Sequence, residues 1–380
     1  MKRTILAIVF LCVMVVGVVV MCVYALLPHR GTKPSMTLHG VGGISSNMNM
    51  ALNHLPTLED AYQSDDSIVF PVALFNGALP LIMIHVGESG SRAAAIMDTG
   101  SEMLLVGDTE RCTTCSTSLF GGAKGSDSAG DQRHGTGVIE FGSQKDHVEF
   151  RVEDIFIDGY EIKKLKFGLV THRQSLTQET SITYNIMGIG GAQVLKHALL
   201  NEMHTKLRKN KPRVFGFMLG KTGNDYLDEE GVFVLGPIPT LLLNQDPIVR
   251  IPLHVKPLSQ YYYTCHVEKI IGHLRNGTNI VYPLNTFPVM FDSGSNYNDF
   301  PQVLSKQFRM LDTMEFVFPG NNRLVLPNSC LMWNRKPKSP LVNFSDTNII
   351  TIGTVALSKF KAFEFELDPA PRLNIYARSS

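Results

Sequence analysis

The sequence carries little charge and almost no net charge. Only 18% of its 380 residues are Asp, Glu, Lys or Arg, and 35 basic residues face 34 acidic ones. A dedicated nucleic-acid-binding protein normally has a basic excess, and a disordered chain lacks the apolar residues that a core needs. Because 44% of the residues are hydrophobic, the composition predicts a globular protein with no nucleic-acid partner.

Cysteine is also scarce, since six cysteines in 380 residues are too few for a disulfide-built scaffold. Cys112 and Cys115 are spaced to close a short loop by a disulfide, and Cys265 and Cys330 are candidates to bridge two distant segments. A zinc site at the first pair is the alternative. No second Cys/His pair of suitable spacing follows it, so no metal is expected.

Three motifs of common enzyme classes are missing. The sequence contains no His-Glu-x-x-His of the zinc proteases and no Gly-x-Ser-x-Gly of the α/β-hydrolases. Gly188-Ile189-Gly190 starts like a dinucleotide-binding fingerprint, but Gln193 occupies the place of the third glycine. These absences exclude the corresponding chemistries, and no cofactor is expected.

The N-terminal region predicts a membrane anchor. Residues 5–27 form an uncharged apolar run long enough to cross a bilayer, and Lys2 and Arg3 before it favour a cytoplasmic N-terminus. We therefore expect residues 1–4 in the cytoplasm, a transmembrane signal-anchor at 5–27 and a tether at 28–67. The alternative is a signal peptide cleaved after the small residue Ala25, which would release a secreted protein.

Either reading places the rest of the chain in the secretory pathway, lumenal or extracellular. Asn276-Gly277-Thr278 and Asn343-Phe344-Ser345 are glycosylation candidates in that compartment. The body itself is predicted to be mainly β. Short apolar runs with turn residues between them recur from Ile68 onward, and one amphipathic helix is expected at about Ala192–Lys209.

One tetrad occurs twice. Asp98-Thr99-Gly100-Ser101 and Asp292-Ser293-Gly294-Ser295 each follow an apolar run, and the two Asp residues are 194 positions apart. A single tetrad of this kind arises by chance, whereas two copies about one lobe apart are far more specific. If each Asp merely capped a turn, no such repeat would be needed.

The repeat predicts a particular chemistry. Two carboxylates held within a few Å of each other cannot both ionise easily, so they share a proton. The charged carboxylate then takes a proton from a bound water, while the protonated one donates a hydrogen bond to a scissile carbonyl. We expect Asp98 and Asp292 to form such a catalytic pair.

With these motifs the chain resembles the pepsin-like aspartic proteases. His134-Gly135-Thr136-Gly137 is similar to the tip of the substrate flap in that family, and Asn185–Gly190 and Thr351–Gly353 resemble the segments that brace the two active-site loops. The resemblance implies a mainly β, bilobal fold with a few short helices. Its lobes are expected at residues 68–250 and 251–380, after the anchor and tether.

The resemblance also implies supporting roles around the pair. Thr99 and Ser293 would interlock the two loops, Gly100 and Gly294 would turn the backbone, and Ser101 and Ser295 would bond the outer carboxylate oxygens. Two positions depart from the family pattern. His134 replaces the usual flap Tyr. It is either a polar loop residue or a residue whose protonation changes how the flap holds the substrate. Leu105 replaces the usual Trp. The tether segment 34–67 lacks Lys and Arg, so latency through a basic propeptide is not expected.

The sequence thus predicts a monomeric aspartic endopeptidase that cleaves an extended polypeptide and contacts the membrane through its N-terminal helix. The alternative is a catalytically inactive, membrane-tethered peptide-binding protein of the same fold. A purely structural ectodomain is a third reading, which predicts neither cleavage nor peptide binding.

Overall fold

The structure is a computed structural model. It describes residues 66–75, 79–87, 90–125, 135–141, 144–176, 184–192, 198–220, 230–243, 245–254, 262–282, 287–306, 308–331 and 342–378. Within these ranges no helix has the length and apolar character needed to cross a membrane. The predicted signal-anchor at 5–27 and nearly all of the predicted tether lie outside them, so the anchor stays a prediction.

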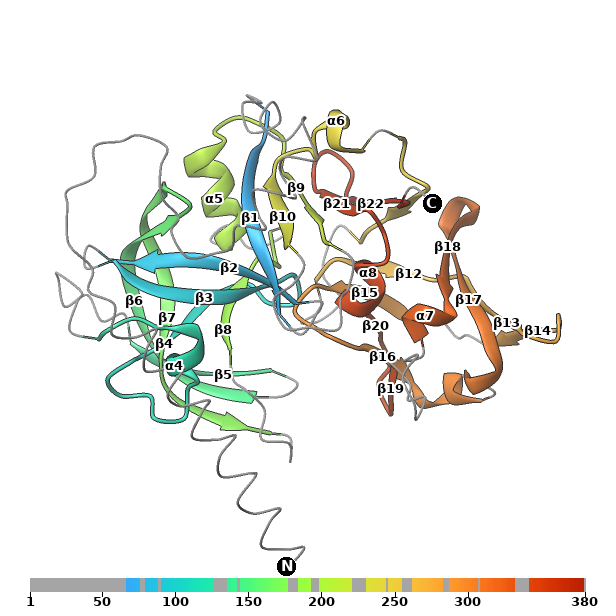
Figure 1. Cartoon of the computed structure of the whole chain (residues 1–380), viewed down its shortest axis with the longest axis horizontal. Helices are drawn as coiled ribbons and strands as arrows, with labels where there is room; N and C mark the ends of the chain where they lie inside the picture. Colours follow the sequence, from blue (N-terminus) through green and yellow to red (C-terminus); the bar gives the residue numbers. More distant parts are fainter. Residues whose placement is uncertain are drawn as a thin grey trace, which may run out of the picture. The chain divides into compact units, whose positions relative to one another are not determined.

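Strands dominate the described chain, as the sequence predicts (Figure 1). The largest sheet has 13 strands in the order β11-β22-β21-β9-β10-β1-β2-β3-β8-β4-β7-β6-β5. Their bounds are β1 (Ile68–Phe75), β2 (Leu79–Val86), β3 (Ser91–Asp98), β4 (Leu104–Gly107), β5 (Thr136–Glu140), β6 (Gln144–Ile157), β7 (Tyr160–Ser175), β8 (Asn185–Gly188), β9 (Val214–Met218), β10 (Glu230–Leu235), β11 (Val249–Pro252), β21 (Ala362–Glu366) and β22 (Arg372–Tyr376).

Two smaller sheets follow in the C-terminal part. A five-stranded sheet has the order β12-β15-β20-β16-β19, and a four-stranded sheet has the order β14-β13-β17-β18. The bounds are β12 (Thr264–His266), β13 (Lys269–Leu274), β14 (Asn279–Tyr282), β15 (Pro288–Asp292), β16 (Asn298–Pro301), β17 (Leu311–Phe318), β18 (Asn322–Pro327), β19 (Val342–Ser345) and β20 (Ile350–Gly353).

The helices are short. They are α4 (Thr117–Phe120), α5 (Leu199–Leu207), α6 (Thr240–Leu243), α7 (Asn328–Leu331) and α8 (Thr354–Leu357), with 3₁₀ turns η1 (Gln302–Ser305), η2 (Phe308–Met310) and η3 (Pro319–Asn321). Helix α5 falls inside the predicted helix at 192–209 and buries Leu199, Leu200 and Met203 on its apolar face. Residues 193–197 of that prediction lie outside the described ranges.

The same strand arrangement occurs in both halves of the chain. Strand β3 runs parallel to β8, and β4 pairs with the other edge of β8 in the antiparallel sense. Strands β15, β20 and β16 repeat this pattern. In each copy the Asp at the end of the first strand lies opposite a glycine, with Asp98 paired to Gly188 and Asp292 to Gly353.

Both of these glycines are required by close packing. A Cβ atom at Gly188 would lie 2.5 Å from the backbone nitrogen of Met103, and one at Gly353 would lie 2.2 Å from the carbonyl oxygen of Tyr297. Side-chain atoms do not tolerate such distances. The apolar segments that end in Gly188 and Gly353 therefore support the two loops from below, because only glycine lets the loop backbone come this close.

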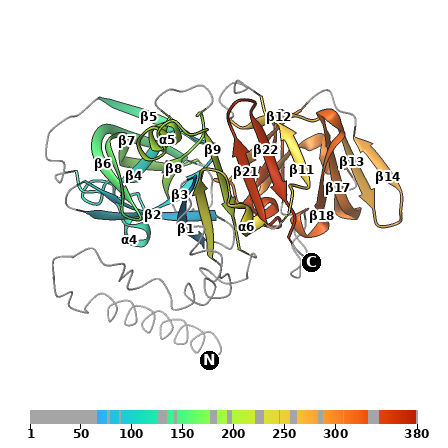
Figure 2. The same cartoon turned by 90° about the horizontal axis from the view of Figure 1, so that it is seen from above.

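The largest sheet crosses the predicted boundary between residues 250 and 251. Strands β21, β22 and β11 lie side by side in Figure 2, and β21 pairs with β9 from the first half of the chain. Phe215 on β9 stacks on Phe365 of β21 with ring centroids 4.7 Å apart. The C-terminal strands are thus joined to the first half by backbone pairing and by buried aromatic rings.

A buried ion pair fixes strands β6 and β7 together. Arg173 donates from Nε to Asp146 Oδ1 at 2.7 Å and from a second guanidinium nitrogen to Oδ2 at 2.6 Å, and the two side chains are 1% and 0% exposed. Arg173 also donates to the carbonyl of Tyr184 at 2.6 Å. Removing one partner would leave an uncompensated buried charge.

We therefore expect Asp146→Ala to destabilise the protein by about 3–5 kcal/mol. The matched control is Glu140→Ala on neighbouring β5, which removes the exposed pair with Lys145 and is expected to cost less than about 1 kcal/mol. Urea unfolding followed by far-ultraviolet circular dichroism measures the stability of both variants. Equal effects of the two substitutions would contradict this assignment.

Candidate active site

The two tetrads meet through a reciprocal set of hydrogen bonds. Thr99 Oγ1 donates to the carbonyl of Phe291 at 2.8 Å, and Ser293 Oγ donates to the carbonyl of Met97 at 2.6 Å. Each hydroxyl also accepts from the backbone of the other loop, with Thr99 N to Ser293 Oγ at 3.1 Å and Ser293 N to Thr99 Oγ1 at 2.9 Å. Both side chains are fully buried, so the loops are interlocked as the resemblance implies.

The interlock brings the two carboxyl groups together. The carboxyl groups of Asp98 and Asp292 are close enough for the charge of Asp98 to raise the pKa of Asp292. Each is also held by its own loop, because Gly100 N donates to Asp98 Oδ1 at 2.7 Å and Gly294 N donates to Asp292 Oδ1 at 2.8 Å. Both acids therefore lie at one site, and each accepts a hydrogen bond from the backbone nitrogen of the glycine two positions after it.

The tetrad glycines leave room for the opposite carboxylate. A Cβ atom at Gly294 would lie 2.3 Å from Asp98 Oδ1, and one at Gly100 would lie 2.9 Å from Asp292 Oδ2. Each acid thus occupies the space that a side chain on the other loop would need. Glycine at these positions is a steric condition for the pair, in addition to easing the turn.

The electrostatics of the site favour a protonated carboxyl group. Burial, together with the neighbouring charge of Asp98 and the hydrogen bond to it, raises the pKa of Asp292 well above its ordinary value. The physical reason is that an ionised Asp292 would lose hydration and face a like charge. The pair is therefore expected to hold one proton above the pH at which an ordinary carboxyl group ionises.

Two asparagines tie neighbouring backbone segments together near the site, namely Asn185, the first residue of the predicted bracing segment, and Asn298, which the sequence analysis did not name. Asn185 accepts from Gly107 N at 2.8 Å and donates to the carbonyl of Ala94 at 3.1 Å. Asn298 accepts from Gly353 N at 3.0 Å and donates to the carbonyl of Cys330 at 3.1 Å. An Asn directly after a Tyr at the start of a strand, found at both positions, was the available signal.

A model of one family matches more than half of the sequence. It is the eukaryotic aspartyl protease family, and the match covers residues 81–315, which contain both tetrads. The chain belongs to the eukaryotic aspartyl protease family. The pepsin-like resemblance seen in the sequence is thereby confirmed.

The fold agrees with this assignment to the aspartyl proteases. The structure is similar to the crystal structure of an aspartic proteinase from Irpex lacteus, with a TM-score of 0.60 and 11% sequence identity. The similarity covers 82% of this chain and 97% of that chain. A comparison with curated proteins finds no match.

The two outer serines differ from the aspartyl protease pattern expected above. Ser295 Oγ donates to the carbonyl of Tyr297 at 2.9 Å, and Ser101 Oγ is buried without a partner among the described residues. The predicted bonds from these serines to the carboxylates are not formed. A local backbone acceptor directs the hydroxyl of Ser295. The hydroxyl of Ser101 instead lies close to Gly188, where an added Cβ atom would be 2.6 Å from Ser101 Oγ.

Only part of the predicted flap lies in the described chain. His134 falls outside it, so its role stays a prediction. Gly135 has φ of 98° and accepts from Phe150 N at 3.0 Å, and Thr136 and Gly137 begin β5, which pairs with β6. Leu105 is fully buried, packed in a cluster with Val148 of β6 and other apolar residues. An aliphatic side chain thus occupies the position where the family usually has Trp.

The cysteine predictions have opposite outcomes. Cys112 and Cys115 form the predicted disulfide with a 2.03 Å bond. The predicted bridge between Cys265 and Cys330 is wrong, because both are free buried thiols. Cys265 lies on β12 and donates to the carbonyl of Val289 at 3.6 Å, whereas Cys330 lies in α7. Both thiols are buried in the hydrophobic core, where burial raises their pKa.

The glycosylation candidates are accessible in the structure. Asn276 and Asn343 are both exposed, and Thr278 donates from its hydroxyl to Asn276 Oδ1 at 2.7 Å.

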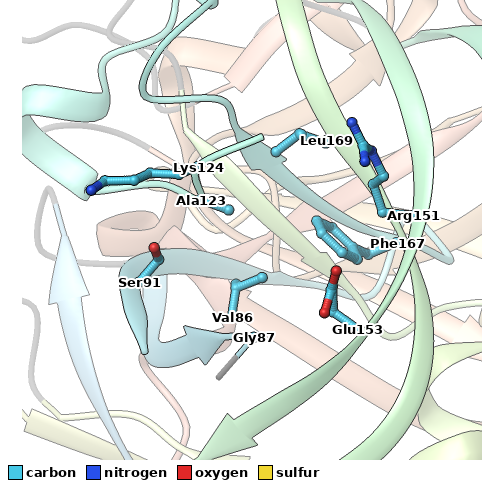
Figure 3. Close-up of a pocket in the computed structure, with 9 residues that line it drawn as sticks. All are labelled: Val86, Gly87, Ser91, Ala123, Lys124, Arg151, Glu153, Phe167 and Leu169. Carbon is cyan, nitrogen blue, oxygen red and sulfur yellow. The ribbon is translucent and has the colours of Figure 1, made fainter. Parts of the chain in front are cut away.

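Figure 3 shows a separate small pocket, lined by Val86, Gly87, Ser91, Ala123, Lys124, Arg151, Glu153, Phe167 and Leu169. Because no tetrad residue lines it, this pocket plays no part in the function proposed below.

Proposed function

We propose that the chain is an aspartic endopeptidase that hydrolyses peptide bonds with water activated by Asp98 and Asp292. The observation that carries this proposal is the pair of carboxyl groups, each lying against the glycine of the opposite loop where the two loops interlock. Membership of the aspartyl protease family supports it. The polypeptide is bound in an extended conformation, with the chain anchored to a membrane of the secretory pathway by residues 5–27.

The proposal gives each acid its own role. Asp98, as the ionised member, accepts a proton from the attacking water, while protonated Asp292 donates to the scissile carbonyl oxygen. Water oxygen bonds to the carbonyl carbon, which becomes a gem-diol. The proton on Asp98 then passes to the leaving nitrogen as the C–N bond breaks, and Asp292 regains its proton from the collapsing diol. The pair returns to its starting state with one proton.

The test is product analysis with the full-length chain in detergent micelles. We expect it to cleave a mixed peptide library at acidic pH, and in H₂¹⁸O each new carboxyl terminus should gain one ¹⁸O atom. Peptide binding without cleavage would reject the endopeptidase in favour of a silent peptide-binding protein. A chain that neither binds nor cleaves the peptides would reject both of these functions and leave a structural ectodomain.

The raised pKa of Asp292 also predicts a pH-dependent stability. Between the ordinary carboxyl pKa and the raised one, the folded chain keeps a proton that the unfolded chain has released, so stability falls as the pH rises through this window. We expect Asp292→Asn to unfold at a higher temperature than the unsubstituted chain at pH 7, with the difference shrinking toward pH 3.

Thermal unfolding at several pH values measures this effect. Asp312→Asn, which changes an exposed carboxyl on β17, is the control and should show no such trend. An Asp292→Asn protein that is less stable than the unsubstituted chain at pH 7 would contradict the assignment of the shared proton.

A further inference from the structure

The five-stranded sheet has one face in the core and one face that carries Asp292. Val289 and Phe291 of β15, Ile350 and Ile352 of β20, and Phe300 of β16 are all fully buried in the hydrophobic core. Because side chains alternate across a strand, Met290 and Asp292 point to the opposite face. That face is where a peptide must lie to reach the proposed catalytic pair.

A third acid lies on the face that carries Asp292. Asp299 of β16 is paired with Thr351 of β20, and Thr351 is paired with Met290 of β15. Directly paired residues share a face, and Met290 and Asp292 are two positions apart on one strand. Asp299 therefore lies two strands from Asp292 on the same side of the sheet. Its charge is close enough to contribute to the raised pKa of Asp292.

The surroundings of Asp299 leave its charge unbalanced within the described residues. The carboxyl is half-buried, and burial raises its pKa, while a hydrogen bond from the Asn343 side chain lowers it. Asn343 is its register partner on β19. No Lys, Arg or His of the described chain forms an ion pair with it, although Asp146, Asp108 and Glu315 all have such partners.

We propose that Asp299 is a specificity-determining residue whose carboxylate binds the cationic side chain of a Lys or Arg in the peptide substrate. The inference rests on the proposed endopeptidase function and adds the class of substrate. Met290, on the strand of Asp292, and Thr351, on the strand between Met290 and Asp299, form a largely buried floor on which the aliphatic stem of such a side chain packs. The ammonium or guanidinium group then replaces the hydration that Asp299 has lost.

The expected preference follows from the strength of a charge-assisted hydrogen bond at a partly desolvated site. Such a bond corresponds to a factor of about 10 to 100 in kcat/KM between a cationic side chain and a neutral one of similar length. Lys against norleucine is the closest matched comparison, because the two side chains differ only in the terminal ammonium group. The preference is expected at one position of the peptide.

The experiment compares peptides that carry Lys, Arg, norleucine or Glu at each position around the cleaved bond, using the full-length chain. We expect the unsubstituted chain to prefer Lys and Arg at one position by about 10- to 100-fold. Asp299→Asn should lose this preference while still cleaving the norleucine peptide, and Asp299→Glu should keep part of it. Asp312→Asn should behave like the unsubstituted chain.

Several outcomes would overturn the inference. One is cleavage with no cationic preference in the unsubstituted chain, and another is a preference that persists in Asp299→Asn. A merely structural role for the Asp299–Asn343 contact would lower cleavage of all peptides equally in Asp299→Asn. Fluorescence anisotropy of the same peptides on Asp98→Asn separates this inference from the proposed function. Lys-selective binding there without any cleavage by the unsubstituted chain would reject the endopeptidase and support the Asp299 site.

Discussion

Asp98→Asn is expected to lower kcat/KM for peptide cleavage by at least about 10³-fold. The amide keeps the shape of the carboxyl group and can still accept from Gly100 N, which donates to Asp98 Oδ1 at 2.7 Å. It cannot take the proton from water, and general base catalysis of this kind contributes roughly 10²–10⁴-fold. We expect the upper part of that range because the same carboxyl later delivers the proton to the leaving nitrogen.

Steady-state kinetics on a single cleaved peptide measure the loss, with circular dichroism to show that the protein is folded. Asp312→Asn is the control for loss of one carboxyl group elsewhere. If Asp98→Asn retained a tenth or more of the original kcat/KM, Asp98 would not be the base, and the proposed mechanism would be wrong.

Gly294→Ala is expected to have the second-largest effect, through geometry rather than charge. The added methyl group would lie 2.3 Å from Asp98 Oδ1 and 2.5 Å from its Cγ, so the Asp98 carboxyl or the second loop must move. A displacement near 1 Å at reacting groups can cost about 10²-fold in rate. Overpacking of this kind also destabilises a protein by about 1–3 kcal/mol.

Gly277→Ala is a matched control for a new methyl group on glycine. Gly277 lies in an exposed turn with φ of 82°, and no heavy atom lies within 4 Å of its Cβ position. It should lose about 1–2 kcal/mol of stability through backbone strain and keep its kcat/KM. A Gly294→Ala protein with unchanged kcat/KM would contradict the close approach of the two loops.

The parts of the site that follow from backbone repetition were predictable from the sequence. Two tetrads behind apolar strands indicated the pair, and the resemblance to the aspartic proteases implied the interlock of Thr99 and Ser293. Both hydroxyls are enclosed where the loops meet, so few other acceptors are available to them.

Ser101 and Ser295 show where a pattern does not determine a contact. The two serines occupy equivalent places in their tetrads, yet one donates to a neighbouring carbonyl and the other has no partner among the described residues. A Ser hydroxyl three positions after the Asp can donate to any of several backbone carbonyls. That choice depends on tertiary packing, which a tetrad does not encode.

The thiols illustrate a second limit of sequence reasoning. An even number of cysteines in a predicted secretory chain suggested a bridge between Cys265 and Cys330, but pairing requires that the fold bring their Cα atoms within about 7 Å. Cys265 on strand β12 and Cys330 in helix α7 are both buried in one hydrophobic core without being bonded to each other. Cys112 and Cys115 are only three positions apart, so their pairing depended on local geometry alone and was predictable.

The most direct test of the shared proton is the pH dependence of kcat/KM for one cleaved peptide. Because the active pair holds a single proton, the rate is expected to rise with pH as the first proton leaves the pair and to fall as the second leaves. The falling limb should lie above the ordinary carboxyl pKa, since the pKa of Asp292 is raised. A bell-shaped profile with that upper limb is the predicted result. A rate that climbs to a plateau and stays there through pH 8 would contradict the account.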